Sequence, residues 1–318
     1  MIEVHDVRKS YGTVEAVKGV SFSVDSNEIV GLLGPNGAGK TTIMKILTCY
    51  HFPSSGSAEV AGLDVYQDSL EIKRRIGYLP ETAPVYPELN VMEYLNFIAD
   101  SREIPSTEKA DRIDHAIEQC GLEKMVYRSI DNLSKGYRQR TGLAQAIVHD
   151  PDILILDEPT SGLDPNQILD IRALITELGK KKTVILSTHI MQEVEAVCGR
   201  VLILNEGRIA AEGTPEEITS ELQGEDLFTL TLKGAESAAA HKALQGLDGV
   251  SSVTDVVTIG GDVCSLRLSM SAGDGYENGE RIFDWAVKSG YKLVDMHRTR
   301  YSLEDIFTKL TKGPKENV

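Results

Sequence analysis

The first third of the chain alternates short apolar runs with polar and turn residues, a pattern that predicts β-strands. Short strands are expected at 2–8, 16–24, 29–33, 57–60 and 76–79, and the first three are expected to form an antiparallel group. Between about 91 and 146 the period changes, because apolar residues such as Ile113, Ala116 and Ile117 recur at spacings of three and four. The sequence therefore predicts a helical insert after the N-terminal strands.

Two later strands are strongly apolar and end in polar side chains. Residues 153–156 run directly into Asp157 and Glu158, and residues 183–188 run into His189. An uninterrupted apolar run is typical of a strand in a parallel sheet that is covered on both faces. Ligands of open α/β sheets bind at the carboxyl ends of the strands, so we expect these two polar endings to lie at one binding site.

The pattern changes again near residue 224. Strands are predicted at 227–233, 250–259, 263–270 and 292–298, and helices at 235–247 and 279–289. A last helix is predicted from Ser302, where an S-x-x-D cap precedes an apolar stripe of Leu303, Ile306, Phe307 and Leu310. The order strand-helix-strand-strand-helix-strand predicts a small ferredoxin-like α+β domain. It carries no motif for chemistry, so a role in assembly or regulation is expected.

Two domains are expected, because 318 residues suffice for two hydrophobic cores. The first is placed at 1–220, as an α/β domain with a helical subdomain at about 85–146. The second is placed at 225–313, as the ferredoxin-like α+β domain.

Composition argues against several classes of function. The formal net charge of −15 disfavours nucleic acid as a partner and disfavours direct attraction to an anionic membrane. No apolar run approaches the roughly 18 residues that span a bilayer, and no apolar leader opens the sequence, so we expect a cytoplasmic protein. The cysteines form no C-x-x-C pair, which predicts buried, reduced side chains at Cys49, Cys120, Cys198 and Cys264.

A glycine-rich segment lies between an apolar strand and a helical run. Its residues fit the pattern G-x-x-x-x-G-K-[ST] and are Gly34, Pro35, Asn36, Gly37, Ala38, Gly39, Lys40, Thr41 and Thr42. Glycines let successive backbone N–H groups turn toward a polyphosphate, and the helix N-terminus adds partial positive charge. Lys40 supplies a full charge, and Thr41 supplies a hydroxyl ligand for magnesium. A glycine-rich turn that only packs strand against helix would need neither, so the expected ligand is a nucleotide.

Asp157 and Glu158 supply what phosphoryl transfer to water requires. One carboxylate can hold Mg²⁺, and the other can orient and deprotonate the attacking water. Two acids at a strand end are often only a solvated turn. Here, however, PTSGLD follows them at 159–164, and LSKGYRQR opens a helix at 133–140.

With these motifs in this order, residues 1 to about 220 resemble the ATP-binding subunits of ABC transporters. GPNGAGKTT corresponds to the Walker A loop, ILILDE to Walker B, and SGLD, which ends at Asp164, to the D-loop. The resemblance implies that Tyr11 stacks on adenine, that Lys40 and Glu158 are catalytic, and that His189 contacts the γ-phosphate. It also implies the fold class, a P-loop ABC cassette with a mixed central sheet, an antiparallel β subdomain and a helical subdomain.

The signature sequence of that family, LSGGQ, is written LSKGY in this chain. Ser134 and Gly136 are retained, and a serine hydroxyl with backbone N–H groups at a helix N-terminus is a second phosphate-binding arrangement. In the family this segment binds the γ-phosphate held by the partner subunit's Walker A loop. The resemblance therefore implies a head-to-tail dimer, with a second copy or a homologous ATPase subunit, that closes around two ATP molecules.

Glu81 departs from the family pattern, because YLPE ends in a carboxylate where the Q-loop usually has glutamine. The magnesium ligands implied by the resemblance are Thr41, Glu81 and Asp157. Glutamine and glutamate both offer a side-chain oxygen to Mg²⁺, but the carboxylate of glutamate adds negative charge beside the γ-phosphate. We expect magnesium binding to survive and the coupling of this loop to a membrane subunit to change.

YLPE, LSKGYRQR and the C-terminal SLEDIF are most similar to the gliding-motility-type and multidrug-type exporter ATPases. Members of that branch work with separately encoded polytopic permease subunits. The resemblance therefore implies an ATPase that drives export from the inner face of the cytoplasmic membrane. The helical insert and residues 82–89 are expected to face the permease.

Two other classes share part of this pattern. A soluble cassette ATPase that acts on ribosomes or DNA ends has the same motifs, but it generally carries two cassettes or a long coiled-coil insertion, and this chain has neither. A nucleotide sensor without catalysis would not need Glu158 and His189. The ribosome-type ATPase remains the alternative to the transporter subunit.

Overall fold

The chain divides into two units, Met1–Pro215 and Glu216–Lys309, and each is described by itself. In this computed structural model the described residues are 1–221, 225–234, 236–260, 262–271 and 275–299, together with 304 and 307. The predicted last helix at 302–310 and the predicted domain end at 313 therefore lie outside the described residues, except for Glu304 and Phe307, which are helical.

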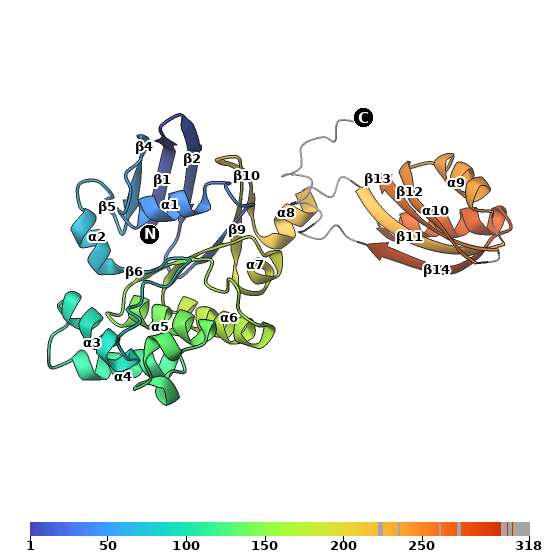
Figure 1. Ribbon diagram of the computed structural model, residues 1–318. Coiled ribbons are helices and arrows are strands. Elements are labelled where there is room, and N and C mark those ends of the chain that lie inside the picture. The colour runs from blue at the N-terminus through green and yellow to red at the C-terminus, as the bar shows by residue number, and fades with distance from the viewer. Residues whose placement is uncertain are drawn as a thin grey trace. The chain divides into compact units, whose positions relative to one another are not determined.

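A six-stranded sheet forms the centre of the first unit (Figure 1). Its order is β10-β9-β3-β8-β7-β6. Neighbours from β9 to β6 are parallel, whereas β10 is antiparallel to β9. The strands are β3 (Ile29–Leu33), β6 (Ile76–Leu79), β7 (Ile153–Asp157), β8 (Thr183–Thr188), β9 (Arg200–Asn205) and β10 (Arg208–Gly213). The predicted mixed central sheet is confirmed.

The other sheet of this unit is antiparallel, in the order β2-β1-β4-β5. Its strands are β1 (Ile2–Tyr11), β2 (Val14–Val24), β4 (Ser55–Val60) and β5 (Leu63–Asp64). The prediction that 29–33 pairs with the first two strands is wrong, because that segment is β3 of the central sheet. Four of its five residues are buried, and a strand with no exposed face fits the interior of a parallel sheet better than an antiparallel edge.

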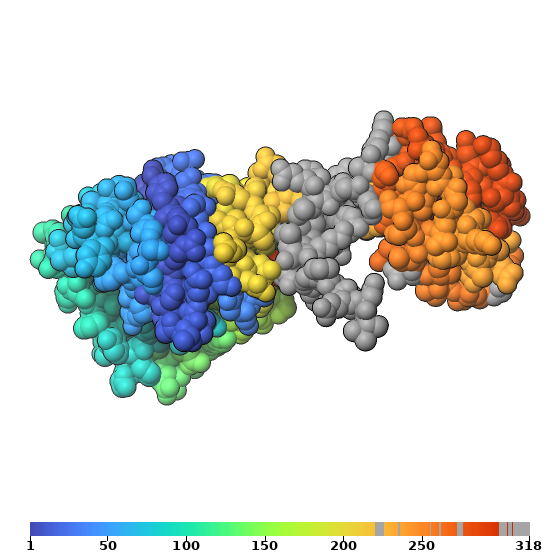
Figure 2. Space-filling view, turned by 90° about the horizontal axis from the view of Figure 1, so that it is seen from above, coloured from blue at the N-terminus to red at the C-terminus, as the bar shows by residue number. Residues whose placement is uncertain are grey.

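The core of the first unit draws on both sheets and on α1 (Lys40–Leu47), with Val4, Ile43 and Ile155 as examples from the three elements. Figure 2 shows the N-terminal strands, in dark blue, on the surface of this unit beside the yellow segment; there β2 contacts β10. Helix α1 contacts β2 and β4 of the antiparallel sheet and β7 of the central sheet, so it lies between the two sheets.

The region that follows β6 is helical, as its periodicity predicts. It contains α3 (Val91–Ser101), α4 (Lys109–Gln119), α5 (Lys135–Ile147) and short 3₁₀ turns at Glu123–Met125 and Ile130–Asn132. Helix α3 begins at a capping box, in which the Asn90 side chain accepts from Glu93 N–H and the Glu93 carboxylate accepts from Asn90 N–H, both at 2.9 Å. The remaining helices of this unit are α2 (Ser69–Arg75), α6 (Pro165–Gly179) and α7 (Met191–Val197), whereas α8 (Pro215–Glu221) begins at the last residue of the first unit and continues into the second. Among the described residues, none of the helices has the length and apolar character needed to cross a bilayer.

The second unit has the predicted ferredoxin-like order. Its elements are β11 (Glu225–Lys233), α9 (Ser237–Gln245), β12 (Val250–Gly260), β13 (Val263–Ser271), α10 (Gly275–Lys288) and β14 (Lys292–Thr299). The sheet order is β12-β13-β11-β14, and all neighbours are antiparallel. Helix α10 begins before the predicted residue 279, because buried Asn278 donates to Asp226 Oδ2 at 2.9 Å and to the Ser271 carbonyl at 3.1 Å. These long-range contacts override the turn preference of glycine and asparagine.

His149 links the end of α5 to β6. Its Nε2 lies 2.9 Å from the Ile76 carbonyl and therefore carries the proton, whereas its buried Nδ1 has no hydrogen-bond partner among the described residues. Burial, reinforced by the positive charges of Arg102, Lys182 and Arg112, lowers the pKa of His149 to about 4. The folded protein thus holds this ring neutral at pH values where the unfolded chain protonates it.

We therefore expect the first unit to lose stability as the pH falls from about 6.5 toward 4, since the unfolded state binds more protons in that window. The contribution of His149 between pH 7 and pH 5 is about 2 kcal/mol. We expect the free energy of unfolding in urea to differ less between pH 7 and pH 5 in His149→Gln than in the wild type. Glutamine keeps a donor for the Ile76 carbonyl. The exposed His115→Gln is the matched control. Equal pH dependence in both variants would contradict the assignment.

Candidate functional site

Three adjacent strands of the central sheet end at the same edge. The parallel register sets Leu33 of β3 beside Thr188 of β8, and Ser187 of β8 beside Asp157 of β7. The segments that follow these strands therefore meet, and they include the glycine-rich loop, Glu158 and His189.

The loop at 34–39 owes its shape to two glycines with left-handed backbone. Gly37 has φ 82°, and Gly39 has φ 108°. A Cβ on Gly39 would lie 2.8 Å from the Ala16 carbonyl oxygen, so a side chain does not fit there. Asn36 and Gly37 are exposed at the tip of the loop, and α1 begins directly after it with backbone N–H groups that have no intrahelical partner. This arrangement fits an anion.

Lys40, Glu158 and His189 form one cluster. Lys40 Nζ lies 3.6 Å from Glu158 Oε1, and the two side chains are only 6% and 10% exposed. Nζ also donates to the Gly34 carbonyl at 2.8 Å and to the Pro35 carbonyl at 3.3 Å. His189 Nδ1 lies 2.8 Å from Glu158 Oε2, and an ionised carboxylate can only accept, so the ring donates. The structure thus brings the three predicted catalytic residues together.

The backbone of Glu158 is unusual for a residue other than glycine, with φ 50°. Its N–H donates to the Ser187 carbonyl at 3.1 Å, which holds the turn against β8. The chain leaves the extended conformation of β7 at this residue. Strained backbone of this kind persists only where the surroundings over-determine it, as at a functional site.

Asp157 is 1% exposed, and its two carboxylate oxygens have different surroundings. Oδ1 accepts from the Ser187 hydroxyl and, at 3.4 Å, from the Thr41 hydroxyl. Oδ2 is buried and has no hydrogen-bond partner among the described residues. A buried carboxylate oxygen is costly unless a cation, a water or a donor satisfies it. The free oxygen beside a threonine hydroxyl fits Mg²⁺, which prefers oxygen ligands and retains several waters.

Tyr11 lies at the end of β1 and is 43% exposed. Its ring meets the His51 ring edge-on at 5.7 Å, and Lys9 Nζ lies 5.4 Å from the Tyr11 ring centroid. The ring is therefore accessible to a planar ligand, and its contact with adenine stays a prediction.

The signature residues lie at the start of α5. The Ser134 hydroxyl caps the helix by accepting from Tyr137 N–H at 3.4 Å, and Gly136 is buried so closely that a Cβ would lie 2.4 Å from Gln167 Oε1. Asp164 caps α6 by accepting from Gln167 N–H at 3.0 Å. Within the described residues, no hydrogen bond or ion pair joins Ser134, Gly136 or Asp164 to Lys40, Glu158 or His189. One copy of the chain does not unite the two groups.

Glu81 follows β6 and is exposed. In the part of the chain that the structure describes, its carboxylate makes no hydrogen bond or ion pair, and so it is not bonded to the Thr41 hydroxyl that meets Asp157. Its predicted role as a magnesium ligand stays a prediction.

Sequence reasoning missed Ser187, whose hydroxyl donates to Asp157 at the end of β7 and whose carbonyl accepts from the N–H of Glu158, directly after that strand. The available signal was its place at the end of a buried strand, directly before Thr188 and His189. Only the pairing of β7 with β8 shows which acids it meets.

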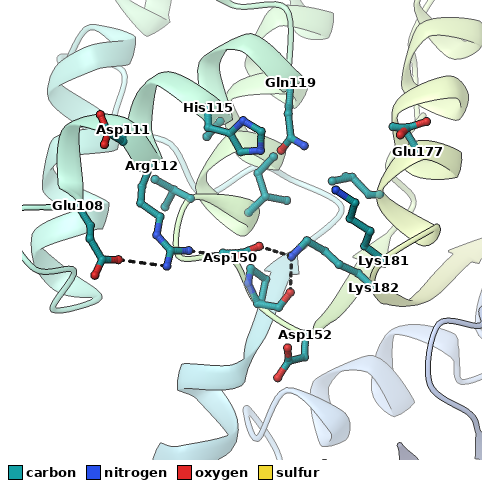
Figure 3. Close-up of a pocket in the computed structure, with 15 residues that line it drawn as sticks. Glu108, Asp111, Arg112, His115, Gln119, Asp150, Asp152, Glu177, Lys181 and Lys182 are labelled. Atoms are coloured by element: carbon teal, nitrogen blue, oxygen red, sulfur yellow. Dashed lines mark hydrogen bonds and ion pairs between the residues drawn. The ribbon is translucent and has the colours of Figure 1, made fainter.

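A hollow of about 680 Å³ lies elsewhere in the first unit, and none of the predicted site residues line it (Figure 3). Two of the cations that line it, Arg112 and Lys182, form ion pairs with acids. Arg112 of α4 meets Glu108 at 3.2 Å and Asp150 at 3.3 Å, and Lys182 donates to Asp150 at 2.5 Å. Asp150 precedes β7 and Lys182 precedes β8, so these contacts fasten the helical region to the sheet.

Comparisons with known proteins identify the family of the chain. A family model described as ABC transporter matches residues 17–161. The chain is 38% identical over 311 residues to the uncharacterized ABC transporter ATP-binding protein YxlF of Bacillus subtilis (strain 168), covering 98% of this chain and 99% of YxlF. It is 31% identical to the linearmycin resistance ATP-binding protein LnrL of the same organism, over 98% of each chain.

Among solved structures, the chain is similar to the dimeric bacterial ABC transporter cassette MJ0796. The TM-score is 0.63 and the identity 25%, over 67% of this chain and 98% of that one. YxlF and MJ0796 are both named as parts of ABC transporters, which favours the transporter subunit over the ribosome-type ATPase. Identity to YxlF over nearly the full length of both chains shows that this chain belongs to the ABC transporter family, as an ATP-binding and ATP-hydrolysing subunit.

Proposed function

We propose that two copies of this chain close around two ATP molecules, each held between the loop of one copy and the signature helix of the other. The observation that supports this is the separation of two phosphate-binding arrangements in one chain. Lys40 lies with Glu158 and His189, whereas Ser134 caps a different helix and has no polar contact with them in the described residues. The dimeric form of the MJ0796 cassette supports the same arrangement.

In this proposal each residue of the cluster has one task. Lys40 supplies positive charge to the β- and γ-phosphates. Oε1 of Glu158 accepts a proton from the attacking water. His189 Nδ1 lies 2.8 Å from Oε2 and keeps the carboxylate oriented. Nε2 of His189 remains available to the γ-phosphate, since the side chain is 48% exposed.

Hydrolysis then reopens the dimer. The γ-phosphate would bridge Lys40 of one copy to Ser134 of the other, so its release removes the contact that favours the closed state. A ligand shifts such an equilibrium only by its differential affinity for the two states. ATP and its products differ in this bridging group, which makes closure depend on the nucleotide.

Asp157 and Thr41 are the proposed protein ligands of Mg²⁺. Asp157 Oδ2 is buried without a partner in the described residues, and the Thr41 hydroxyl contacts the same carboxylate at Oδ1. When bound, Mg²⁺ neutralises developing charge on the phosphates. Tyr11 is proposed to stack on adenine, and Asp164 to lie near the partner's nucleotide.

Glu81 is proposed as a third, outer oxygen for Mg²⁺, and Glu81→Gln should therefore retain ATP hydrolysis. The amide keeps an oxygen but loses the negative charge, and the side chain is exposed, so folding is expected to be unaffected. Hydrolysis measured against magnesium concentration tests this expectation. Loss of all Mg-ATP binding in the variant would rule out an interchangeable oxygen at this position.

We further propose that the dimer drives export through separate permease subunits, with the ATPase at the inner face of the cytoplasmic membrane. Support comes from the relatives, since LnrL is named for resistance to linearmycin. In the chain, Tyr86 and Phe97 form an exposed aromatic pair with ring centroids 5.4 Å apart, on the segment predicted to face a permease. Exposed apolar groups of this kind suit a protein interface.

Affinity capture of the full chain from detergent-solubilised cells tests this proposal. A polytopic membrane protein in stoichiometric amount, whose capture depends on Tyr86 and Phe97, is the expected result. Capture of ribosomes in its place would support the soluble alternative and overturn the transporter assignment of the partner.

A further inference from the structure

Glu193 on α7 is a buried acid without a cationic partner. Glu193 is only 1% exposed, and no lysine, arginine or histidine forms an ion pair with it in the described residues. Burying a carboxylate is costly unless hydrogen bonds compensate it. Here the compensation comes from two threonine hydroxyls, one on each carboxylate oxygen: Thr160 donates to Oε1, and Thr188 donates to Oε2 at 2.6 Å.

The two threonines flank the catalytic cluster. Thr160 lies two residues after Glu158, and Thr188 lies directly before His189. The Thr188 hydroxyl also accepts from Ile190 N–H at 3.0 Å, so the backbone is held on both sides of His189. Both threonines are almost fully buried, at 3% and 0% exposed. One carboxylate thus connects the turn that carries Glu158 to the turn that carries His189.

We infer that Glu193 is a positioning residue for hydrolysis, which sets the contact between Glu158 and His189 through Thr160 and Thr188. This inference rests on the proposed roles of Glu158 and His189. Hydrogen bonds to an ionised group are short and strong, and a buried network that is fully satisfied rigidifies its members. An apolar residue in place of Glu193 would leave both hydroxyls without their acceptor and free the two turns to move independently.

Glu193→Ala should lower kcat for Mg-ATP by roughly tenfold or more, since small displacements of catalytic groups have effects of this size. The affinity for ATP should stay within about twofold, because among the described residues the side chain of Lys40 bonds to its own loop and to Glu158, and that of Glu193 bonds to Thr160 and Thr188. Glu193→Gln, which keeps one acceptor, should restore most of kcat. Glu195→Ala, on an exposed position of the same helix, is the matched control and should leave kcat unchanged.

A second pair of variants covers the case in which Glu193→Ala fails to fold. Thr160→Val and Thr188→Val each remove one hydroxyl with little change of volume, and each should lower kcat without changing ATP affinity. In the Glu158→Gln background, Glu193→Ala should have no further effect on the residual rate, because it acts through Glu158. A purely structural role would instead lower ATP affinity and thermal stability together with kcat.

An unchanged kcat in Glu193→Ala, Thr160→Val and Thr188→Val would overturn the inference. So would an additive effect of Glu193→Ala in the Glu158→Gln background. If the proposed roles of Glu158 and His189 were wrong, the result would be different. Glu158→Gln would then hydrolyse ATP as the wild type does, whatever the effect of Glu193→Ala.

Discussion

Glu158→Gln should bind ATP and hydrolyse almost none of it. General-base catalysis contributes about 10²–10⁴-fold, so turnover is expected to fall at least about 100-fold. ATP binding should persist, because Lys40 and the loop that carries it remain in place. Because hydrolysis is blocked, the γ-phosphate that bridges the two copies is not cleaved and released. The variant should therefore accumulate as an ATP-bound dimer.

Phosphate release and sedimentation, both measured with Mg-ATP, test this expectation together. Glu195→Gln, an exposed acid on α7, is the matched control and should behave as the wild type. Turnover that is unchanged in Glu158→Gln would remove Glu158 from the role of base. Loss of ATP binding with normal folding would instead indicate that its ion pair with Lys40 is needed to form the loop.

Asp157→Asn should uncouple the site from magnesium. The substitution keeps an acceptor for the Ser187 and Thr41 hydroxyls but replaces one carboxylate oxygen by an amide donor, which cannot ligate a cation. The magnesium concentration for half-maximal hydrolysis should rise at least about tenfold, and turnover should fall. ATP binding in the presence of EDTA should be unaffected, because Asp157 then has no cation to hold.

Titration of hydrolysis with Mg²⁺ measures the effect. Asp152→Asn changes an exposed acid just before the opposite end of β7 and serves as the control for a general loss of charge. A magnesium dependence equal to that of the wild type would exclude Asp157 as a ligand.

Local sequence patterns predicted most elements of the fold. Apolar runs located β7 and β8, and a spacing of three and four located α4 with buried Ile113, Ala116 and Ile117. The assignment of β3 failed because the sheet a strand joins depends on distant segments, here β8 and β9. The predicted start of α10 was wrong for the same reason, since Asn278 donates to Asp226 of the distant strand β11.

The site was predictable as a set of motifs but not as a geometry. The glycine-rich loop identified Lys40, and the strand endings identified Glu158 and His189. Their mutual contacts depend on the register of three strands that lie far apart in the sequence, which no local pattern specifies. Ser187 and Glu193 were missed for that reason, because their importance comes only from the residues they touch in space.

The central claim is that each ATP site is completed by a second copy, and mixing two inactive variants tests it most directly. Lys40→Ala removes the phosphate-binding charge, and Ser134→Arg blocks the signature helix. In a mixed dimer one site combines both lesions, while the other combines an intact loop with an intact signature. The account predicts ATP hydrolysis on mixing that clearly exceeds the sum of the separate variants. Hydrolysis that stays at that sum at every mixing ratio would contradict it.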